Sequence, residues 1–149
     1  MDQNDVKEFR ELTRILERNL ELLNKSDCCS GNITTAQCHA LVEIGRKNNL
    51  MLKDLAVILQ IDVSTSSRVV EELVKKEFVM RESSSTDRRS VQINLTQKGQ
   101  TLFEKIEYDM EQLFDQILSL MEEKEQKTLL RSLKNYNQAI EQLMRRKAE

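Results

Sequence analysis

Apolar residues recur every three or four positions along three long stretches of this chain, a spacing that places them on one face of an α-helix. The stretches run from Asp5 to Asn24, from Thr96 to about Met121 and from about Glu122 to Arg146. We therefore predict three long amphipathic helices, each with an apolar stripe that needs a partner. The stripes consist of Val6, Phe9, Leu12, Leu16, Leu20 and Leu23; of Phe103, Ile106, Met110, Leu113, Ile117 and Leu120; and of Leu130, Leu133, Asn137, Ile140 and Met144.

Shorter helices are predicted between the first two long ones. Thr34 with Gln37 three residues later is a capping-box pattern, which opens a helix. A short apolar pattern at Leu52–Leu59 predicts the next helix, and Gln60–Asp62 forms a turn into a third. Two short helices joined by a tight turn are typical of a helix-turn-helix.

The helix that follows Asp62 has two different faces. Val69, Val70 and Leu73 share the apolar face, which we expect to lie inward. The opposite face is rich in hydroxyl groups and charges, as expected of a surface that reads DNA, and holds Ser64, Thr65, Ser67, Arg68, Glu71 and Glu72.

A β-hairpin is predicted directly after this helix. Phe78–Met80 and Val91–Leu95 bracket a polar, basic tip, and the second run alternates apolar with polar residues as a half-buried strand does. Thr96 then stands where its side-chain oxygen caps a new helix. With no proline and three glycines in 149 residues, the expected class is mainly α with one small β-hairpin. The architecture is a winged helix-turn-helix with long terminal helices.

These segments resemble the MarR-type winged-helix regulators of bacteria and archaea. Asp87-Arg88-Arg89 followed by Leu95-Thr96-x-x-Gly99 is similar to the wing signature of that family, D-x-R and then L-T-x-x-G. The remaining similar segments are Thr34-x-x-Gln37, Leu52-Lys53-Asp54-Leu55-Ala56 and Ser64-Thr65-x-Ser67-Arg68. The chain departs from the family at Glu77, usually glycine, at Met51, usually a Ser or Thr cap, and at Cys38, usually aromatic.

The resemblance implies one domain, in which residues 34–98 form the DNA-binding lobe and residues 1–25 and 99–149 form dimerisation helices. It implies a transcriptional regulator, and we expect a repressor. On the reading helix, Arg68 suits a bidentate contact to guanine, and the hydroxyls of Ser64, Thr65 and Ser67 suit phosphates or base edges. The alternative is a solvated polar helix face.

The wing tip carries the other expected DNA contacts. Arg88 or Arg89 suits a narrow A·T-rich minor groove, which attracts guanidinium groups. The D-x-R pattern of the family implies that Asp87 holds Arg89 in place. Without the resemblance, these residues form only a charged turn.

The charge of the chain is unevenly distributed. The formal net charge is −2, which is unusual for a protein that binds DNA phosphates. The segment from Lys75 to Lys98, however, contains six cations and three anions. A sequence-specific DNA-binding protein needs only such a local basic region. The cations are Lys75, Lys76, Arg81, Arg88, Arg89 and Lys98, and the anions are Glu77, Glu82 and Asp87.

Two other protein classes fit the sequence poorly. No apolar run approaches the roughly 20 residues that span a bilayer, and the charged N-terminus is unlike a secretory signal, so we expect a cytoplasmic protein without membrane association. One histidine, no glycine-rich phosphate loop and no nucleophile motif leave no catalytic set, so we expect no enzymatic activity.

The three long apolar stripes must be buried against another apolar surface. An intramolecular helical bundle is one solution, and a homodimer of interleaved terminal helices is the one we favour. A two-fold dimer carries two reading helices, so its operator on double-stranded DNA should be an inverted repeat with half-sites about 10 base pairs apart.

Cys28, Cys29 and Cys38 lie within eleven residues of one another, beside the only histidine, His39. Clustered thiols in a cytoplasmic protein favour redox or metal chemistry over structural disulfides. Three thiolates suit a soft metal or metalloid ion, although His39 and Cys38 diverge by about 100° on a helix. The alternative is that Cys38 is a small core residue and the Cys28-Cys29 pair has no role.

The effector therefore stays open. The sequence indicates no certain cofactor: thiol oxidation, a soft ion or, as in MarR-like proteins, a small aromatic ligand would each switch DNA affinity. A winged-helix module that binds only other proteins is a further alternative, which the basic wing tip and Arg68 disfavour.

Overall fold

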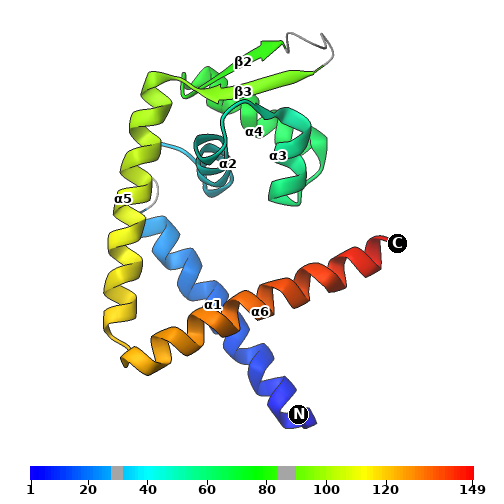
Figure 1. Cartoon of the computed structure of the whole chain (residues 1–149), viewed down its shortest axis with the longest axis vertical. Helices are drawn as coiled ribbons and strands as arrows, with labels where there is room; N and C mark the ends of the chain where they lie inside the picture. The colour runs from blue at the N-terminus through cyan, green and yellow to red at the C-terminus, as the bar shows by residue number, and fades with distance from the viewer. Residues whose placement is uncertain (28–31, 84–89) are drawn as a thin grey trace. The chain divides into compact units, whose positions relative to one another are not determined.

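The computed structural model describes residues 1–27, 32–83 and 90–149, which form two units, Met1–Met110 and Glu111–Glu149. Helix α5 begins in the first unit and ends in the second. The mainly helical class with a small hairpin is confirmed (Figure 1). In chain order the elements are α1 (Gln3–Asp27), α2 (Thr35–Arg46), β1 (Leu50–Met51), α3 (Leu52–Leu59), α4 (Val63–Lys75), β2 (Val79–Ser83), β3 (Val91–Leu95), α5 (Gln97–Ser119) and α6 (Glu123–Ala148).

The described strands form a three-stranded antiparallel sheet in the order β1-β3-β2. Strands β2 and β3 are the arms of the predicted hairpin, paired from Val79↔Leu95 to Ser83↔Val91. Strand β1, which pairs with the other edge of β3, was not predicted from the sequence. Its two residues are too few to show the alternation by which a strand is recognised.

The chain turns into β1 at Asn49, whose φ of 56° lies in the left-handed region that asparagine tolerates. Its backbone N–H donates to Asn94 Oδ1 at 2.9 Å, and Asn94 Nδ2 donates to Asn49 Oδ1 at 3.2 Å. These two hydrogen bonds hold the turn against β3.

The core of the first unit lies between α2, α3, α4 and the sheet. Its fully buried apolar residues come from each of these elements, and Leu102 and Ile106 of α5 add to the same cluster. The largest of them are Leu41, Leu55, Leu73 and Ile93. The winged helix-turn-helix elements therefore share one hydrophobic core.

The predicted start of α2 is confirmed. Thr34 Oγ1 accepts the Gln37 N–H and Gln37 Oε1 accepts the Thr34 N–H, both at 3.2 Å, which completes a capping box. Helix α3 begins differently, because Met51 occupies its N-cap and makes no side-chain cap bond. This departure from the family pattern leaves the first N–H groups of α3 without that stabilisation.

The L-T-x-x-G segment joins the hairpin to α5. Thr96 Oγ1 accepts the Gly99 N–H at 3.0 Å and donates to the Glu77 carbonyl at 2.6 Å. A Cβ on Gly99 would lie 1.9 Å from the Phe78 carbonyl oxygen, so only glycine lets α5 approach this closely. Glu77 adopts φ 65°, the left-handed conformation that glycine would adopt without strain.

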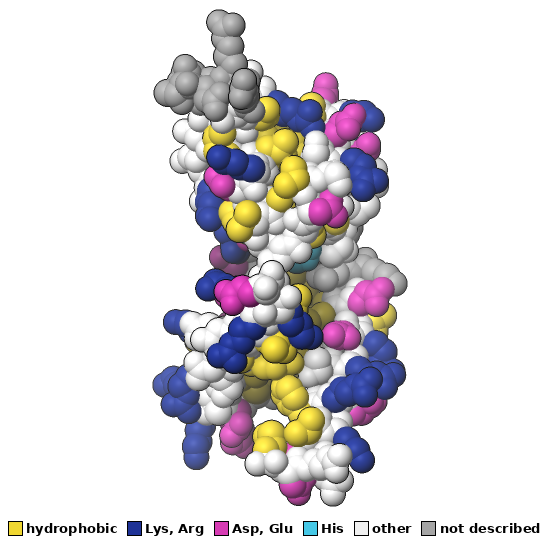
Figure 2. Space-filling view, turned by 90° about the vertical axis from the view of Figure 1, so that its right-hand side faces the viewer, with side chains coloured by type: hydrophobic (Ala, Val, Ile, Leu, Met, Phe, Trp, Pro, Cys, Tyr) yellow, Lys and Arg dark blue, Asp and Glu magenta, His cyan; other side chains and the backbone are white. Residues whose placement is uncertain are grey.

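The long helices carry exposed apolar residues. The α1 stripe from Val6 to Leu20 is between 38% and 56% exposed. None of the residues of α6, all of which the structure describes, is buried, and Leu130 is 75% exposed. Figure 2 shows hydrophobic side chains on one face of the molecule, in yellow. Within the described residues, no helix combines the length and apolarity needed to cross a bilayer.

We expect Gly99→Ala to lower the free energy of unfolding by about 3 kcal/mol, at the upper end of the usual cost of overpacking. The added methyl group would meet the Phe78 carbonyl, which accepts the Thr96 N–H, so the clash cannot be relieved by a side-chain rotation. Urea denaturation followed by circular dichroism measures this difference. Glu104→Ala, an exposed position of the same helix, is the control and should change stability by less than about 0.5 kcal/mol. Equal stability of Gly99→Ala and the parent protein would contradict the close packing.

Candidate nucleic-acid interface

Helix α4 begins at Asp62, whose carboxylate caps it. Asp62 Oδ1 accepts the Thr65 N–H at 2.7 Å and the Ser64 hydroxyl at 2.5 Å, and Oδ2 accepts the Thr65 hydroxyl at 2.8 Å. The hydrogen bonds from Ser64 and Thr65, with a smaller effect of the Arg68 charge, lower the pKa of Asp62 from 3.8 to about 2. The carboxylate is therefore ionised throughout the physiological pH range.

The inward face of α4 determines which residues face outward. Ser66, Val70 and Leu73 are fully buried against the core, at intervals of four and three residues. Val69, also expected inward, is only partly buried. The predicted reading residues lie on the rest of the helix: Ser64 and Arg68 are exposed, and Thr65 and Ser67 are partly exposed.

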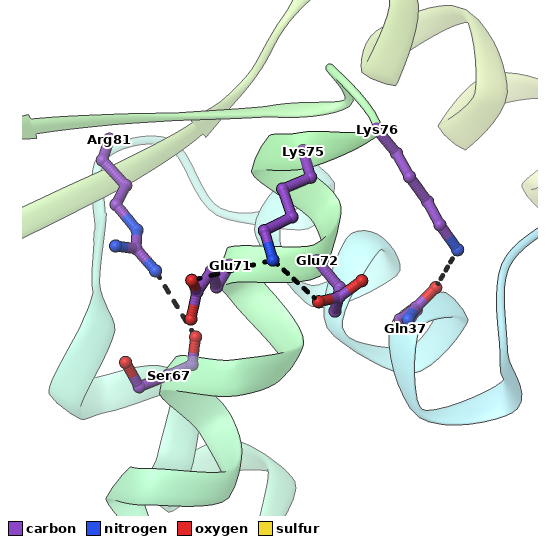
Figure 3. Close-up of polar contacts among 7 residues, drawn as sticks. All are labelled: Gln37, Ser67, Glu71, Glu72, Lys75, Lys76 and Arg81. Atoms are coloured by element: carbon purple, nitrogen blue, oxygen red, sulfur yellow. Dashed lines mark hydrogen bonds and ion pairs between the residues drawn. The ribbon is translucent and has the colours of Figure 1, made fainter.

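Arg81 links the wing to helix α4 through a hydrogen bond. It lies on β2, is exposed, and its guanidinium donates to the Ser67 carbonyl at 3.4 Å (Figure 3). From the sequence, Arg81 was one of the local cations and had no predicted role. Its position in the first hairpin strand was the only hint that it could lie near the reading helix. The packing of β2 beside α4 shows that its positive charge lies on the same surface as Arg68.

The cations at the end of α4 are engaged within the protein. Lys75 lies 3.9 Å from Glu71 and 3.4 Å from Glu72. Lys98 Nζ donates to the Lys76 carbonyl at 3.1 Å and lies 4.8 Å from the centre of the Phe78 ring. Arg68 and Arg81 are both exposed and add positive charge to the surface along α4.

Lys76 connects α4 to the start of α2. Its ammonium donates to the Asn32 carbonyl at 2.7 Å. It also donates to Gln37 Oε1 at 2.8 Å (Figure 3). Gln37 Oε1 also accepts the Thr34 N–H in the capping box, and Gln37 is only 8% exposed. The C-terminal end of the reading helix is thus tied to the first residues after the α1–α2 connection.

The predicted wing-tip residues Asp87, Arg88 and Arg89 lie outside the described residues. The hairpin that carries them is described up to the pair Ser83↔Val91. Cys28 and Cys29 also lie outside the described residues. The predictions made for these five residues therefore stand on the sequence.

Cys38 and His39 lie on different faces of α2. Cys38, the fourth residue of the helix, is 8% exposed and belongs to the hydrophobic core, while His39 is exposed. Within the described part of the chain, no three His, Cys, Asp or Glu side chains are arranged to hold a metal ion. A soft-ion site would therefore need Cys28 or Cys29 beside Cys38.

A shallow, open surface depression lies between α2 and α3. Apolar side chains of α3 and of the turn after it form one wall, and His39 and Glu43 of α2 bring ionisable groups to the other. The complete lining consists of Thr35, Ala36, His39, Glu43, Ile58, Leu59 and Ile61. A mixed apolar and ionisable lining suits a small amphipathic molecule.

Comparisons with known proteins agree with this architecture. The model of the MarR family matches residues 33–91. The transcriptional regulator BilQ of Clostridium symbiosum is 28% identical over 133 residues, which cover 89% of this chain and 92% of BilQ.

Two solved structures are similar in fold. Streptococcus pneumoniae FabT in complex with DNA has a TM-score of 0.80 and 23% identity and covers 95% of this chain and 99% of its own. Streptomyces coelicolor PcaV in complex with its natural ligand has a TM-score of 0.73 and 19% identity and covers 87% of this chain and 91% of its own. At these identities the likeness concerns the fold alone.

Proposed function

We propose that this chain is a DNA-binding transcriptional regulator of the MarR type rather than an enzyme, and that it reads a specific operator through α4. The observation that carries the proposal is the division of α4 into a buried face and an outward face of Ser64, Thr65, Ser67 and Arg68. Arg68 makes a bidentate contact to guanine in the major groove. Arg88 or Arg89 of the wing enters the minor groove, with Asp87 holding Arg89.

The working form is a homodimer. Helices α1 and α6 each carry a stripe of exposed apolar side chains. Single exposed apolar residues are common on protein surfaces, but a continuous stripe indicates an interface. A second copy of the chain supplies the same stripes, so a two-fold arrangement buries them together. The two α4 helices then read an inverted repeat, and the protein acts as a repressor by occupying promoter DNA.

An effector changes the affinity of this dimer for DNA. The thiol cluster is supported by the Lys76 contacts, because Asn32 and Gln37 link the segment that follows Cys28 and Cys29 to the end of α4. Oxidation of Cys28, Cys29 and Cys38, or a soft metal or metalloid ion held by them, would move this segment; His39 lies on another face of α2 and would not join the site. The link would transmit the movement to the reading helix.

A small aromatic ligand is the second candidate effector. It is favoured by the depression between α2 and α3, whose apolar wall suits a ring and whose ionisable residues suit a polar substituent. PcaV, solved in complex with its natural ligand, gives a precedent for ligand binding within the same fold. Such a ligand would act directly on the helix-turn-helix, because α3 precedes α4 by one turn.

The dimer proposal predicts that Ile140→Glu shifts the protein towards monomer, because a buried carboxylate would have no partner in an apolar interface. Sedimentation velocity at micromolar concentration measures the change. Gln142→Glu adds the same charge about 200° around the helix and should leave the dimer intact. A parent protein that sediments as a monomer would refute the proposal.

The reading surface predicts that Arg68→Ala weakens operator binding by about 1–3 kcal/mol and relaxes base preference at one position. Arg89→Ala should instead lower affinity uniformly and reduce the salt slope by about 1. Fluorescence anisotropy at several salt concentrations separates the two effects, with Lys127→Ala of α6 as a charge-matched control. Binding without any salt dependence would favour a module that binds only proteins.

The thiol switch predicts that oxidant, zinc or arsenite changes operator affinity by about 5–150-fold, the usual range of allosteric coupling. Cys38→Ser, or Cys28→Ser with Cys29→Ser, should abolish the response. Lys76→Met keeps the thiols but removes the link to α2, so it should reduce the response as well. If all three reagents leave affinity within twofold, the effector is a small organic ligand.

A further inference from the structure

The hydroxyl groups of Ser64 and Thr65 are both bound to one carboxylate. A carboxylate accepts hydrogen bonds and donates none, so both hydroxyl hydrogens must point towards Asp62. The remaining lone pairs of the two oxygens then face away from it. While Asp62 holds them, Ser64 and Thr65 can accept hydrogen bonds from DNA but cannot donate them.

This polarity restricts what the start of α4 can contact. Phosphate oxygens, guanine O6 and N7, and thymine O4 are all acceptors, so these two hydroxyls offer them no hydrogen-bond donor. The hydrogen-bond donors that the bases present in the major groove are the amino groups at cytosine N4 and adenine N6. The negative charge of Asp62, which is exposed, adds repulsion towards phosphates and attraction towards these amino groups.

The donors of the same helix lie further along. Arg68 is exposed and carries donors only, so it complements the acceptors at the helix start. On the outward face of α4, Ser64 and Thr65 therefore offer acceptors beside Asp62 and Arg68 offers donors one turn later, while the exposed Glu71 and Glu72 add acceptors further along the helix.

We propose that Asp62 is a positioning residue for DNA recognition: by holding the Ser64 and Thr65 hydroxyls as acceptors, it makes the start of α4 select bases with an exposed amino group. The inference rests on the proposed reading of an operator by α4. Beyond that proposal, Asp62 caps α4 and also determines that the Ser64 and Thr65 hydroxyls act as hydrogen-bond acceptors. Capping alone would affect helix stability and leave base preference unchanged.

The test uses the full-length protein and a duplex that it selects from a random-sequence library. In that duplex, each cytosine in turn is replaced by 2-pyrimidinone and each adenine by purine, which deletes a single amino group. Dissociation constants are measured at fixed salt. For the parent protein, deletion at one or two positions in each half-site should weaken binding about tenfold.

Asp62→Asn is the informative variant. Its side-chain oxygen still accepts the Thr65 N–H, and asparagine caps helices about as well as aspartate, so thermal unfolding should change little. Its Nδ2–H2 group, in place of Oδ2, donates to the Thr65 hydroxyl and frees that hydroxyl hydrogen to donate elsewhere, whereas Oδ1 still accepts the Ser64 hydroxyl. The amino-group deletion that reports on Thr65 should therefore weaken binding by less than about twofold. Asp54→Asn of α3 makes the same change in charge and should keep the tenfold sensitivity.

A second variant guards against misfolding of the first. Ser64→Ala with Thr65→Ala leaves the Thr65 N–H to Asp62 hydrogen bond in place and removes both hydroxyl acceptors. It should also lose the sensitivity to amino-group deletion. The inference is overturned if no single deletion weakens parent binding, or if both variants keep the parent sensitivity. If no duplex is selected at all, the proposed operator reading fails and the inference fails with it.

Discussion

The backbone of Phe78 is the point at which the reading helix, the wing and α5 are joined. Its N–H donates to the Leu73 carbonyl at the end of α4, and its carbonyl accepts the Thr96 N–H before α5, both at 3.0 Å. The same carbonyl lies where a side chain on Gly99 would have to be. One residue therefore sets where α4 ends, where β2 begins and how closely α5 approaches. Without this junction, the wing and the reading helix would have no fixed relation to the start of α5.

The apolar residues of the chain serve two different purposes. Those of α2, α3, α4 and the sheet form a core within one chain, because short helices packed on a small sheet can enclose one another's faces. The stripes of α1 and α6 remain exposed, and burial of each large side chain would contribute about 1.5–3 kcal/mol. This unrealised stabilisation is the physical reason for proposing a second chain.

Although the net charge is −2, the charged residues are unevenly distributed along the chain. Lys75, Lys76 and Lys98 stabilise the junction through ion pairs and backbone carbonyls and do not form a general basic surface. Arg68 and Arg81 stay open beside α4, while Asp62 places an anion at its start.

The sequence by itself determined the elements whose signals are local. Periodicity located the long helices, and Thr34, Asp62 and Thr96 marked helix starts because a cap acts on N–H groups within three residues. The outward placement of Ser64 and Arg68 also followed, since a helix face is set by spacing alone.

Only the tertiary structure decided what depends on residues far apart in the chain. Strand β1 exists because β3 lies beside it, Arg81 joins the reading surface because β2 packs along α4, and Lys76 reaches Asn32 across 44 residues. The role of Gly99 was equally hidden, because its neighbour is the Phe78 carbonyl rather than any residue within one helical turn. Such contacts leave no periodic trace in the sequence, because packing brings together residues that no local rule relates.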